Sequence, residues 1–219
     1  MANDSGDTSL PDYEKKNPEP HERSQNETPT NGKAHSYLRR LDAAAYRGIA
    51  EVHWSLTIDQ RKCGWLDREV HLHFRELLVH TSFRYGICCP MYCLMPDHMH
   101  LLWVGWRENA DQRVAMKFFR SQINRLLLKP RVCVLQKQGY DRVLRGQQRS
   151  PDGLGDVAAY IRANPVRAGL CDDSKDYRFA GCVMPGYPEL DIDADDYWPR
   201  FWRIYWKLRD DDDSSASPL

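Results

Sequence analysis

The sequence predicts an α+β fold in which helices pack on a plaited, antiparallel sheet of the ferredoxin-like kind. Segments in which apolar and polar residues alternate are interleaved with segments of helical period, and turn residues separate neighbouring strand segments. Without its two polar ends, the chain keeps about 175 residues, which is enough for a single domain with one core.

The first strand is predicted over residues 50–58, where apolar and polar side chains alternate with the period of a half-buried strand. A helix follows, because Asp67 can cap its N-terminus and apolar residues recur at helical spacing up to about Tyr85. The apolar positions of the strand are Val52, Trp54, Leu56 and Ile58, and the polar positions are Glu51, His53, Ser55 and Thr57.

Two more strand segments are predicted over 90–95 and 98–104, with a Pro-Asp break between them. They form either two adjacent strands or one bent strand. Residues 111–129 return to helical period, with an apolar stripe on one side and a cationic stripe on the other. The apolar stripe consists of Ala115, Phe119, Ile123 and Leu126.

Residues 131–145 are predicted to form a hairpin or a strand and turn, and a loop then leads into a short helix over 156–163. The acidic segment 171–196 is predicted to be a loop, and 198–208 a short helix of alternating rings and cations. Such a mixture either stacks bases and neutralises the backbone of single-stranded nucleic acid or packs its rings in the core.

Residues 1–34 and 210–219 are polar and acidic and are predicted to be disordered, which leaves 35–209 as the single domain. The whole chain carries 31 basic and 31 acidic residues. Residues 1–34 hold seven acidic and four basic groups, 171–196 hold eight and two, and 210–219 hold four and none. The remaining residues carry 25 basic and 12 acidic groups, which favours a polyanionic partner such as nucleic acid.

Several classes of protein are excluded by the same composition. The longest apolar runs are a few residues, far short of the roughly 20 that span a bilayer, and the N-terminus does not resemble a secretory signal. The seven cysteines are odd in number and include no Cys-x-x-Cys pair, which argues against a disulfide framework and a zinc ribbon. We therefore expect a cytoplasmic, nucleoid-associated protein without membrane contact.

His98 and His100 are the first candidates for chemistry. On a strand, side chains two residues apart project from the same face, so these imidazoles can converge on one ion while Met99 and Leu101 face the core. Two histidines on a strand can equally be a partly buried polar pair. The pair at His71 and His73 has the same spacing but lies in a predicted helix, where the two rings should diverge.

Tyr160 and Asn164 are the second pair of candidates. Four residues apart on a helix, a phenolic oxygen and an amide oxygen can be offered to the same point. A tyrosine can attack phosphorus if a cation draws charge from the phosphate oxygens. The alternative is ordinary, because tyrosine packs on many helices and an asparagine before proline often ends one.

Three motifs, taken together and in this order, resemble the REP-associated tyrosine transposases, which belong to the single-tyrosine HUH transposases. The resemblance covers roughly residues 45–185. Its motifs are Met95-Pro96-Asp97-His98-Met99-His100, then Gly139-Tyr140-Asp141-Arg142-Val143-Leu144-Arg145, then Tyr160-Ile161 and Asn164-Pro165-Val166-Arg167-Ala168-Gly169-Leu170. The acidic segment 171–196 and the long N-terminal tail have no counterpart in the family pattern.

The resemblance implies a ferredoxin-like HUH endonuclease fold and an enzyme that nicks and rejoins single-stranded DNA beside hairpins of palindromic repeats. By the same resemblance, His98, His100 and Asn164 would bind Mg²⁺ or Mn²⁺. Tyr160 would form a 5′-phosphotyrosine intermediate. Two imidazoles suit an ion tolerant of nitrogen ligands, such as Mn²⁺, with water and phosphate oxygens completing its shell.

The expected partner is single-stranded or hairpin DNA, and the sequence leaves a monomer and a homodimer both open. Two other functions also stay open, namely a hairpin-binding protein that has lost cleavage and a metal-dependent phosphodiesterase that uses water as its nucleophile. The basic side chains predicted to contact DNA are Arg113, Lys117, Arg120, Arg142, Arg145, Arg162 and Arg167, and each of them could instead belong to a solvated surface.

Overall fold

The computed structural model describes residues 40–131, 133–146 and 150–215, so the predicted tail 1–34 lies outside the described residues. Within them, strands and helices follow one another in the order expected from the sequence, with one further strand. The elements are β1 (Glu51–Thr57), α1 (Arg68–Tyr85), β2 (Ile87–Leu94), β3 (His98–Gly105), α2 (Gln112–Arg131), β4 (Tyr140–Val143), α3 (Pro151–Arg167), β5 (Ala180–Val183) and α4 (Tyr197–Ser215).

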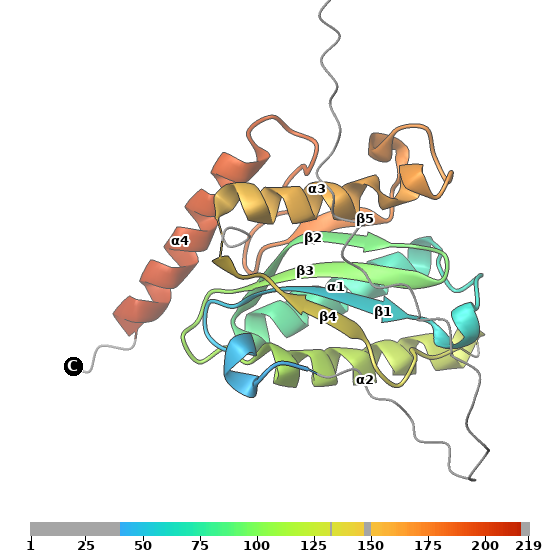
Figure 1. Cartoon of the computed structure of the whole chain (residues 1–219), viewed down its shortest axis with the longest axis horizontal. Coiled ribbons are helices and arrows are strands. Elements are labelled where there is room, and N and C mark those ends of the chain that lie inside the picture. Colours follow the sequence, from blue (N-terminus) through green and yellow to red (C-terminus); the bar gives the residue numbers. More distant parts are fainter. Residues whose placement is uncertain (1–39, 132, 147–149, 216–219) are drawn as a thin grey trace, which may run out of the picture. The chain divides into compact units, whose positions relative to one another are not determined.

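The five strands form one antiparallel sheet in the order β4-β1-β3-β2-β5 (Figure 1). The first six elements run β-α-β-β-α-β, and their strands take the order 4-1-3-2 of a ferredoxin-like fold. Strand β5 extends this sheet beside β2. The prediction of an α+β fold with a plaited antiparallel sheet is therefore confirmed.

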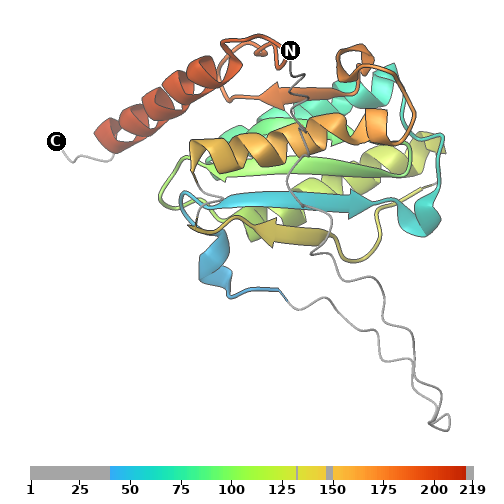
Figure 2. The same ribbon diagram turned by 45° about the horizontal axis from the view of Figure 1, so that its top comes forward.

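Helices cover both faces of the sheet, with α1 and α2 on one side and α3 on the other (Figure 2). Strands β1 and β3 turn Trp54 and Trp103 towards α1 and α2, and Trp103 lies against Phe119 of α2 with ring centroids 5.6 Å apart. Because side chains alternate along a strand, the polar positions of β1 and β3 face α3. The main core thus fills one face, and on the other face polar side chains lie beside buried apolar ones such as Leu102 of β3 and Ile161 of α3.

The boundaries of α1 follow from its capping residues. The Asp67 side chain accepts a hydrogen bond from the amide of Val70 at 2.9 Å, as the sequence predicts. The helix ends at Gly86, whose φ of 64° is left-handed and suits glycine. Strand β2 starts directly afterwards at Ile87, three residues before the predicted strand 90–95.

Helix α3 is longer than the predicted helix over 156–163. Ser150 caps it by accepting a hydrogen bond from the amide of Gly153 at 3.1 Å, and a proline occupies the first turn, where no helical partner is lost. At the other end the helix continues past Pro165 to Arg167. The stretch predicted as a loop before residue 156 is therefore the first turn of the helix that carries Tyr160.

Two further predictions near the C-terminus are wrong. The segment 171–196 is not wholly a loop, because β5 pairs with β2 within it; four residues without clear alternation give no strand signal. Helix α4 continues to Ser215, so residues 210–215 of the predicted disordered tail are helical. Asp212 forms an ion pair with Arg107 at 3.1 Å, which ties this last part of the helix to the body. None of the described helices is long and apolar enough to cross a membrane.

We expect Gly105→Ala to be among the most destabilising single substitutions in the sheet. A Cβ at this position would lie 1.8 Å from the carbonyl oxygen of Gly48, which is backbone and cannot rotate away. Strand β3 or the backbone around Gly48 would have to move, at a cost of about 3 kcal/mol in the free energy of unfolding. Urea unfolding measures this cost, and Gly146→Ala, whose Cβ would meet no atom within 4 Å, is the comparison without a clash, although its φ is positive and that of Gly105 is not. Equal stabilities of the two variants would contradict the close approach.

Candidate functional site

His98 and His100 lie on β3 and face α3, with their Nε2 atoms 3.0 Å apart. The intervening Met99 belongs to the core on the opposite face of the sheet. The helical pair behaves differently, since His71 bonds the hydroxyl of Tyr92 while His73 bonds the backbone of its own helix. The predicted convergence of one pair and divergence of the other are both present in the structure.

Each imidazole of the strand pair is held through its other nitrogen. His98 Nδ1 lies 2.6 Å from Asp97 Oδ1, and because a carboxylate only accepts, this nitrogen carries the proton. His100 Nδ1 lies 3.0 Å from Nε2 of His53 on the neighbouring strand β1. If His53 accepts this bond, the Nε2 lone pairs of His98 and His100 both face the space between them. Such outer contacts fix ring orientation and tautomer at metal sites.

Burial keeps the two inner rings neutral. Burial, followed by the charge of the nearby Arg142 guanidinium, lowers the pKa of His53 to about 4. Burial, followed by the neighbouring His53 and His98 rings, holds the pKa of His100 well below its usual value. A neutral imidazole has a lone pair to donate, so at neutral pH these rings have the ionisation state of metal ligands.

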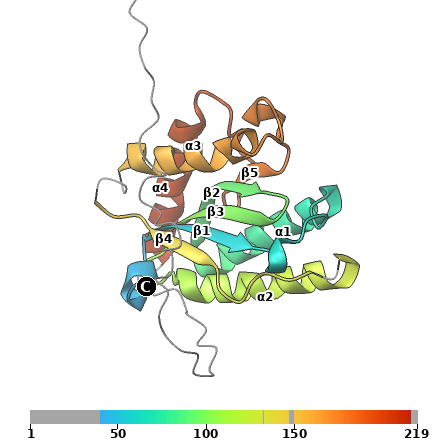
Figure 3. The same cartoon turned by 45° about the vertical axis from the view of Figure 1, so that its right-hand side comes forward.

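Tyr160 projects from α3 towards this histidine cluster. Its ring centroid lies 6.3 Å from that of His53 and 6.4 Å from that of His100, in edge-to-face arrangements. Helix α3 runs along β2 and β3 (Figure 3), and its contacts with both strands fix the helix on this face. The phenol and the imidazoles, which are distant in sequence, therefore share one site.

Asn164 lies one turn beyond Tyr160 and binds its own helix. Its side-chain nitrogen donates to the carbonyl oxygens of Tyr160 at 2.9 Å and Ile161 at 3.3 Å. Pro165 has no N–H, so the Ile161 carbonyl lacks its usual helical donor, and the asparagine amide replaces it. This use of the nitrogen explains how the helix passes through a proline, and it leaves the amide oxygen as the atom that could bind an ion.

The donor set fits a divalent ion bound jointly by protein and substrate. Two cis ligands of an octahedral ion at about 2.1 Å lie about 3.0 Å apart, which is the separation of the two Nε2 atoms. Among the described residues no group of three or more His, Cys, Asp or Glu side chains is arranged to hold a metal ion. Imidazoles and an amide oxygen would thus leave several positions for water and phosphate oxygens.

The predicted cations of β4 and α3 lie around this site, and they differ in the residues that they contact. The Arg167 guanidinium lies 5.0 Å from the centroid of the Tyr160 ring, and Arg142 pairs with His53 in the β1–β4 register. Arg162 instead forms a bidentate ion pair with Asp193 of the acidic segment, with its closest contact at 2.7 Å, and its side chain is only 11% exposed. Arg142 and Arg167 thus lie close to the histidines and the phenol, and the Arg162 guanidinium is held by Asp193.

The cationic stripe of α2 lies on the opposite face of the sheet from the histidines, because α2 packs on the core face. Arg113, Lys117 and Arg120 line a hollow of about 410 Å³ together with Arg40 and Lys137. Burial and the nearby Arg40 lower the pKa of Arg120, whose guanidinium donates to the carbonyls of Gln136 and Lys137. The structure does not bring this stripe together with Tyr160.

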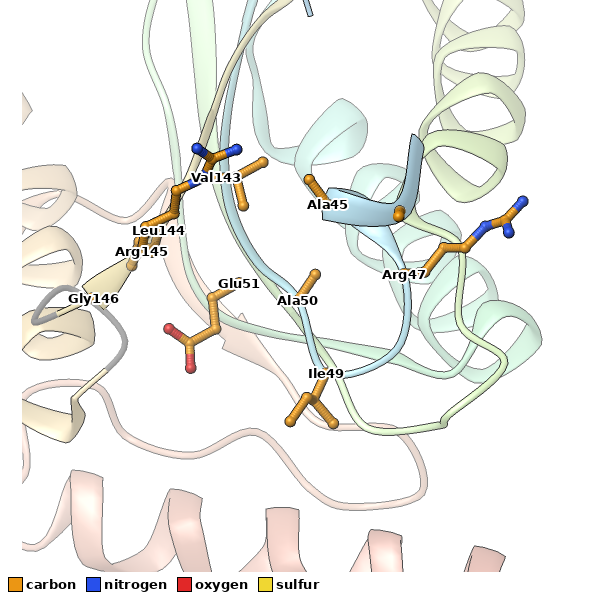
Figure 4. A pocket seen from close by; sticks show the side chains of 10 residues that line it. Ala45, Arg47, Ile49, Ala50, Glu51, Val143, Leu144, Arg145 and Gly146 are labelled. Atoms are coloured by element: carbon orange, nitrogen blue, oxygen red, sulfur yellow. The ribbon is translucent and has the colours of Figure 1, made fainter. Parts of the chain in front are cut away.

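Arg145 lies at a second hollow, of about 340 Å³, between the start of β1 and the end of β4 (Figure 4). The carboxylate of Glu51 and the side chain of Ile49 line the same hollow, as Figure 4 shows. Glu51 pairs with Val104 in the β1–β3 register, whereas His98 pairs with Thr57 at the other end of β1. This hollow is therefore separate from the histidine pair.

Sequence reasoning assigned no role to His53, Asp97 or Asp193. His53 could have been suspected, because the alternation of the first strand places it on the polar face that also carries the strand's other hydrophilic residues. Asp97 stands directly before the histidine pair but has no pattern that marks it as a partner. Nothing local links Asp193 to Arg162, 31 residues earlier.

Comparisons with known proteins support the fold. No protein-family model matches the chain, and no curated protein matches it. A solved structure of a REP-associated tyrosine transposase bound to a REP hairpin is similar, with a TM-score of 0.55, 16% identity, and coverage of 66% of this chain and 81% of that one. Two structures of a bacterial tRNA(His) guanylyltransferase-like protein, one with GTP and one with ATP, have TM-scores of 0.44 and 0.41. Each is 12% identical and covers 75% of this chain and 94% of its own chain.

At 16% identity the first of these likenesses concerns the backbone and not the chemistry. The chain is therefore a mixed α+β protein with the fold of this transposase.

Proposed function

We propose that this protein is a metal-dependent endonuclease and strand transferase that cuts and rejoins single-stranded DNA beside hairpins. The observation that carries the proposal is the meeting of Tyr160 with His53 and His100 on one face of the sheet, at ring distances of 6.3 and 6.4 Å. The likeness in fold to a hairpin-bound tyrosine transposase supports it.

The nucleophile in this proposal is the hydroxyl oxygen of Tyr160. It attacks the phosphorus of one phosphodiester, a Tyr–O–P bond forms, and the bond from phosphorus to the 3′ oxygen breaks. The phenolic proton passes to solvent, and the departing 3′ oxygen takes up a proton to become a hydroxyl. The products are a 5′-phosphotyrosine and a free 3′-hydroxyl end.

His98, His100 and the amide oxygen of Asn164 would hold Mg²⁺ or Mn²⁺ beside the phosphate. The ion, when bound, supplies charge that stabilises the phosphate oxygens and favours loss of the phenolic proton. Arg167, close to the Tyr160 ring, adds a fixed positive charge to the same region. His53 and Asp97 keep the two imidazoles oriented through their second nitrogens.

The reverse of this step joins DNA. A 3′-hydroxyl from the same or another strand attacks the phosphotyrosine, the P–O(Tyr) bond breaks, and the phenol regains its proton. Because one phosphate ester replaces another, the exchange needs no nucleotide cofactor. Only one tyrosine lies in the site, so each site holds one covalent strand at a time.

An adduct assay tests the proposal. A single-stranded hairpin oligonucleotide, labelled at its 3′ end, is incubated with the full chain and Mn²⁺, and the mixture is separated on a denaturing protein gel. We expect a covalent protein–DNA band that disappears when a chelator is added first. Cleavage without a band would indicate water as nucleophile, and hairpin binding without cleavage would indicate a binding protein; either result would refute the proposal.

A further inference from the structure

We propose that a row of three tryptophans on α4, formed by Trp198, Trp202 and Trp206, stacks on bases of single-stranded DNA outside the tyrosine site. This inference rests on the proposed function, since it assigns a second contact to the same substrate. The row is distinct from the histidine cluster and from both cationic regions described above.

Helix α4 carries two aromatic stripes, and one of them is fully buried. Tyr197, Phe201 and Tyr205 are buried, and the two tyrosine hydroxyls donate to the carbonyls of Pro90 and Gly105 on the sheet side. The tryptophans lie on the neighbouring stripe, one turn apart from each other. The buried contacts of α4 with the sheet therefore come from the first stripe, while Trp206 at the end of the second stripe is exposed.

The three indoles form a continuous stack. The ring centroids of Trp198 and Trp202 are 6.4 Å apart with an interplanar angle of 28°, and those of Trp202 and Trp206 are 6.5 Å apart at 29°. Exposure is greatest at Trp206, whose residue surface is 53% exposed. Single exposed apolar residues are common, but a stacked row that ends in an open indole is a surface suited to flat ligands.

The inner end of the row lies against the helix that carries the nucleophile. A Cβ at Gly155 of α3 would lie 3.8 Å from Nε1 of Trp198, so the first indole packs beside the first turns of α3. Tyr160 is five residues further along the same helix. Five residues along a helix correspond to a rise of about 7.5 Å and a turn of about 140°, so a strand bound at Tyr160 would pass around α3 to reach Trp198 and then follow α4.

Cations beside the row favour a polyanion as the occupant, although the exposed Asp210 continues the same stripe one turn beyond Trp206. At about 100° per residue, Arg203 and Lys207 project from the solvent side of α4 next to the tryptophan row, and both are exposed. The Arg209 guanidinium lies 5.8 Å from the Trp206 ring, although it also pairs with Glu108. Single-stranded DNA offers bases to the rings and phosphates to the cations.

Fluorescence anisotropy with a labelled oligothymidylate of about 15 nucleotides tests the row, because this probe cannot form a hairpin. We expect Trp206→Ala to weaken binding about tenfold, as loss of one stacked base does. Trp206→Leu should weaken binding by the same factor, because leucine is apolar but has no ring on which a base can stack. The matched control is Phe83→Ala, which removes a 62% exposed ring from α1 and should leave the affinity unchanged.

The contribution of the α4 cations to DNA affinity is measured separately. Lys207→Gln should lower the slope of log affinity against log salt by about one phosphate contact. Unchanged affinity in Trp206→Ala would overturn the inference, and so would full retention in Trp206→Leu, which would indicate apolar docking of another kind. Sedimentation of the free protein identifies that second case if the chain self-associates and Trp206→Ala does not.

The adduct assay separates this inference from the proposed function. If the wild-type chain forms no phosphotyrosine band but Trp206→Ala still loses oligothymidylate binding, the enzyme proposal fails and the stacking row stands. If the band forms normally and Trp206→Ala binds the probe as tightly as the wild type, the row fails and the enzyme stands.

Discussion

Tyr160→Phe should abolish the covalent protein–DNA adduct while leaving hairpin binding nearly intact. The substitution removes one oxygen atom and keeps the ring that contacts His53 and His100 edge to face. Loss of a nucleophile that no other group replaces lowers the rate by about 10³-fold or more. The measurement is the yield of adduct on a denaturing gel under single-turnover conditions, with hairpin affinity determined in parallel.

Tyr140→Phe is the matched control for this experiment. Tyr140 is an exposed tyrosine on β4, 46% accessible, and it belongs to another of the motifs that support the resemblance. We expect its phenylalanine variant to form the adduct at the wild-type rate. An adduct that survives in Tyr160→Phe and vanishes in Tyr140→Phe would make Tyr140 the nucleophile and refute the assignment of Tyr160.

Much of the fold could be predicted because local patterns and tertiary packing agree in the first two thirds of the chain. The alternation of apolar and polar residues around Trp54 predicts which face of β1 is buried in the core. The Asp67 cap and Gly86 predict the two ends of α1. The predicted convergence of His98 and His100 follows from strand geometry alone. At these places a residue and its near neighbours hold all the information that is needed.

The prediction fails where a distant partner decides the structure. The glycines and the proline before residue 156 suggest a loop but are accepted in α3, because Pro151 lies in the first turn and Gly155 lies against Trp198 of α4. Further along the helix, Asn164 replaces the donor that Pro165 lacks. Strand β5 exists because β2 offers it an edge. The partnership of Arg162 with Asp193 is likewise invisible in either local segment.

The site shows the same division. The two histidines and the tyrosine can be selected from motifs, but the ring that orients His100 comes from a strand 47 residues earlier and is set by the β1–β3 pairing. The α2 stripe, by contrast, has the spacing of a DNA-binding surface and lies on the far side of the sheet from the phenol. The spacing of cations along a helix determines which face of the helix carries them, but it does not determine which side of the sheet the helix covers.

His98→Gln and His100→Gln should each lower Mn²⁺-dependent adduct formation about 10²-fold or more, because each removes one of two imidazoles in a site that the protein only partly completes. Hairpin affinity should change little, since phosphate contacts of cationic side chains supply most of it. His73→Gln is the matched control, as it alters the second histidine of the pair with identical spacing on α1, where the ring is exposed. Equal losses in all three variants would mean that the effect is not one of ion binding.

His53→Gln should act on the ion rather than on the chemical step. His53 does not face the space between His98 and His100 but bonds Nδ1 of His100 at 3.0 Å. Losing such an orienting partner weakens metal affinity by about 10- to 100-fold. We therefore expect the Mn²⁺ concentration for half-maximal adduct formation to rise by that factor, while the rate at saturating Mn²⁺ returns close to the wild-type value. A lower rate that saturating Mn²⁺ does not restore would instead make His53 a participant in the reaction, because a residue that only orients a ligand is no longer needed once the ion is bound.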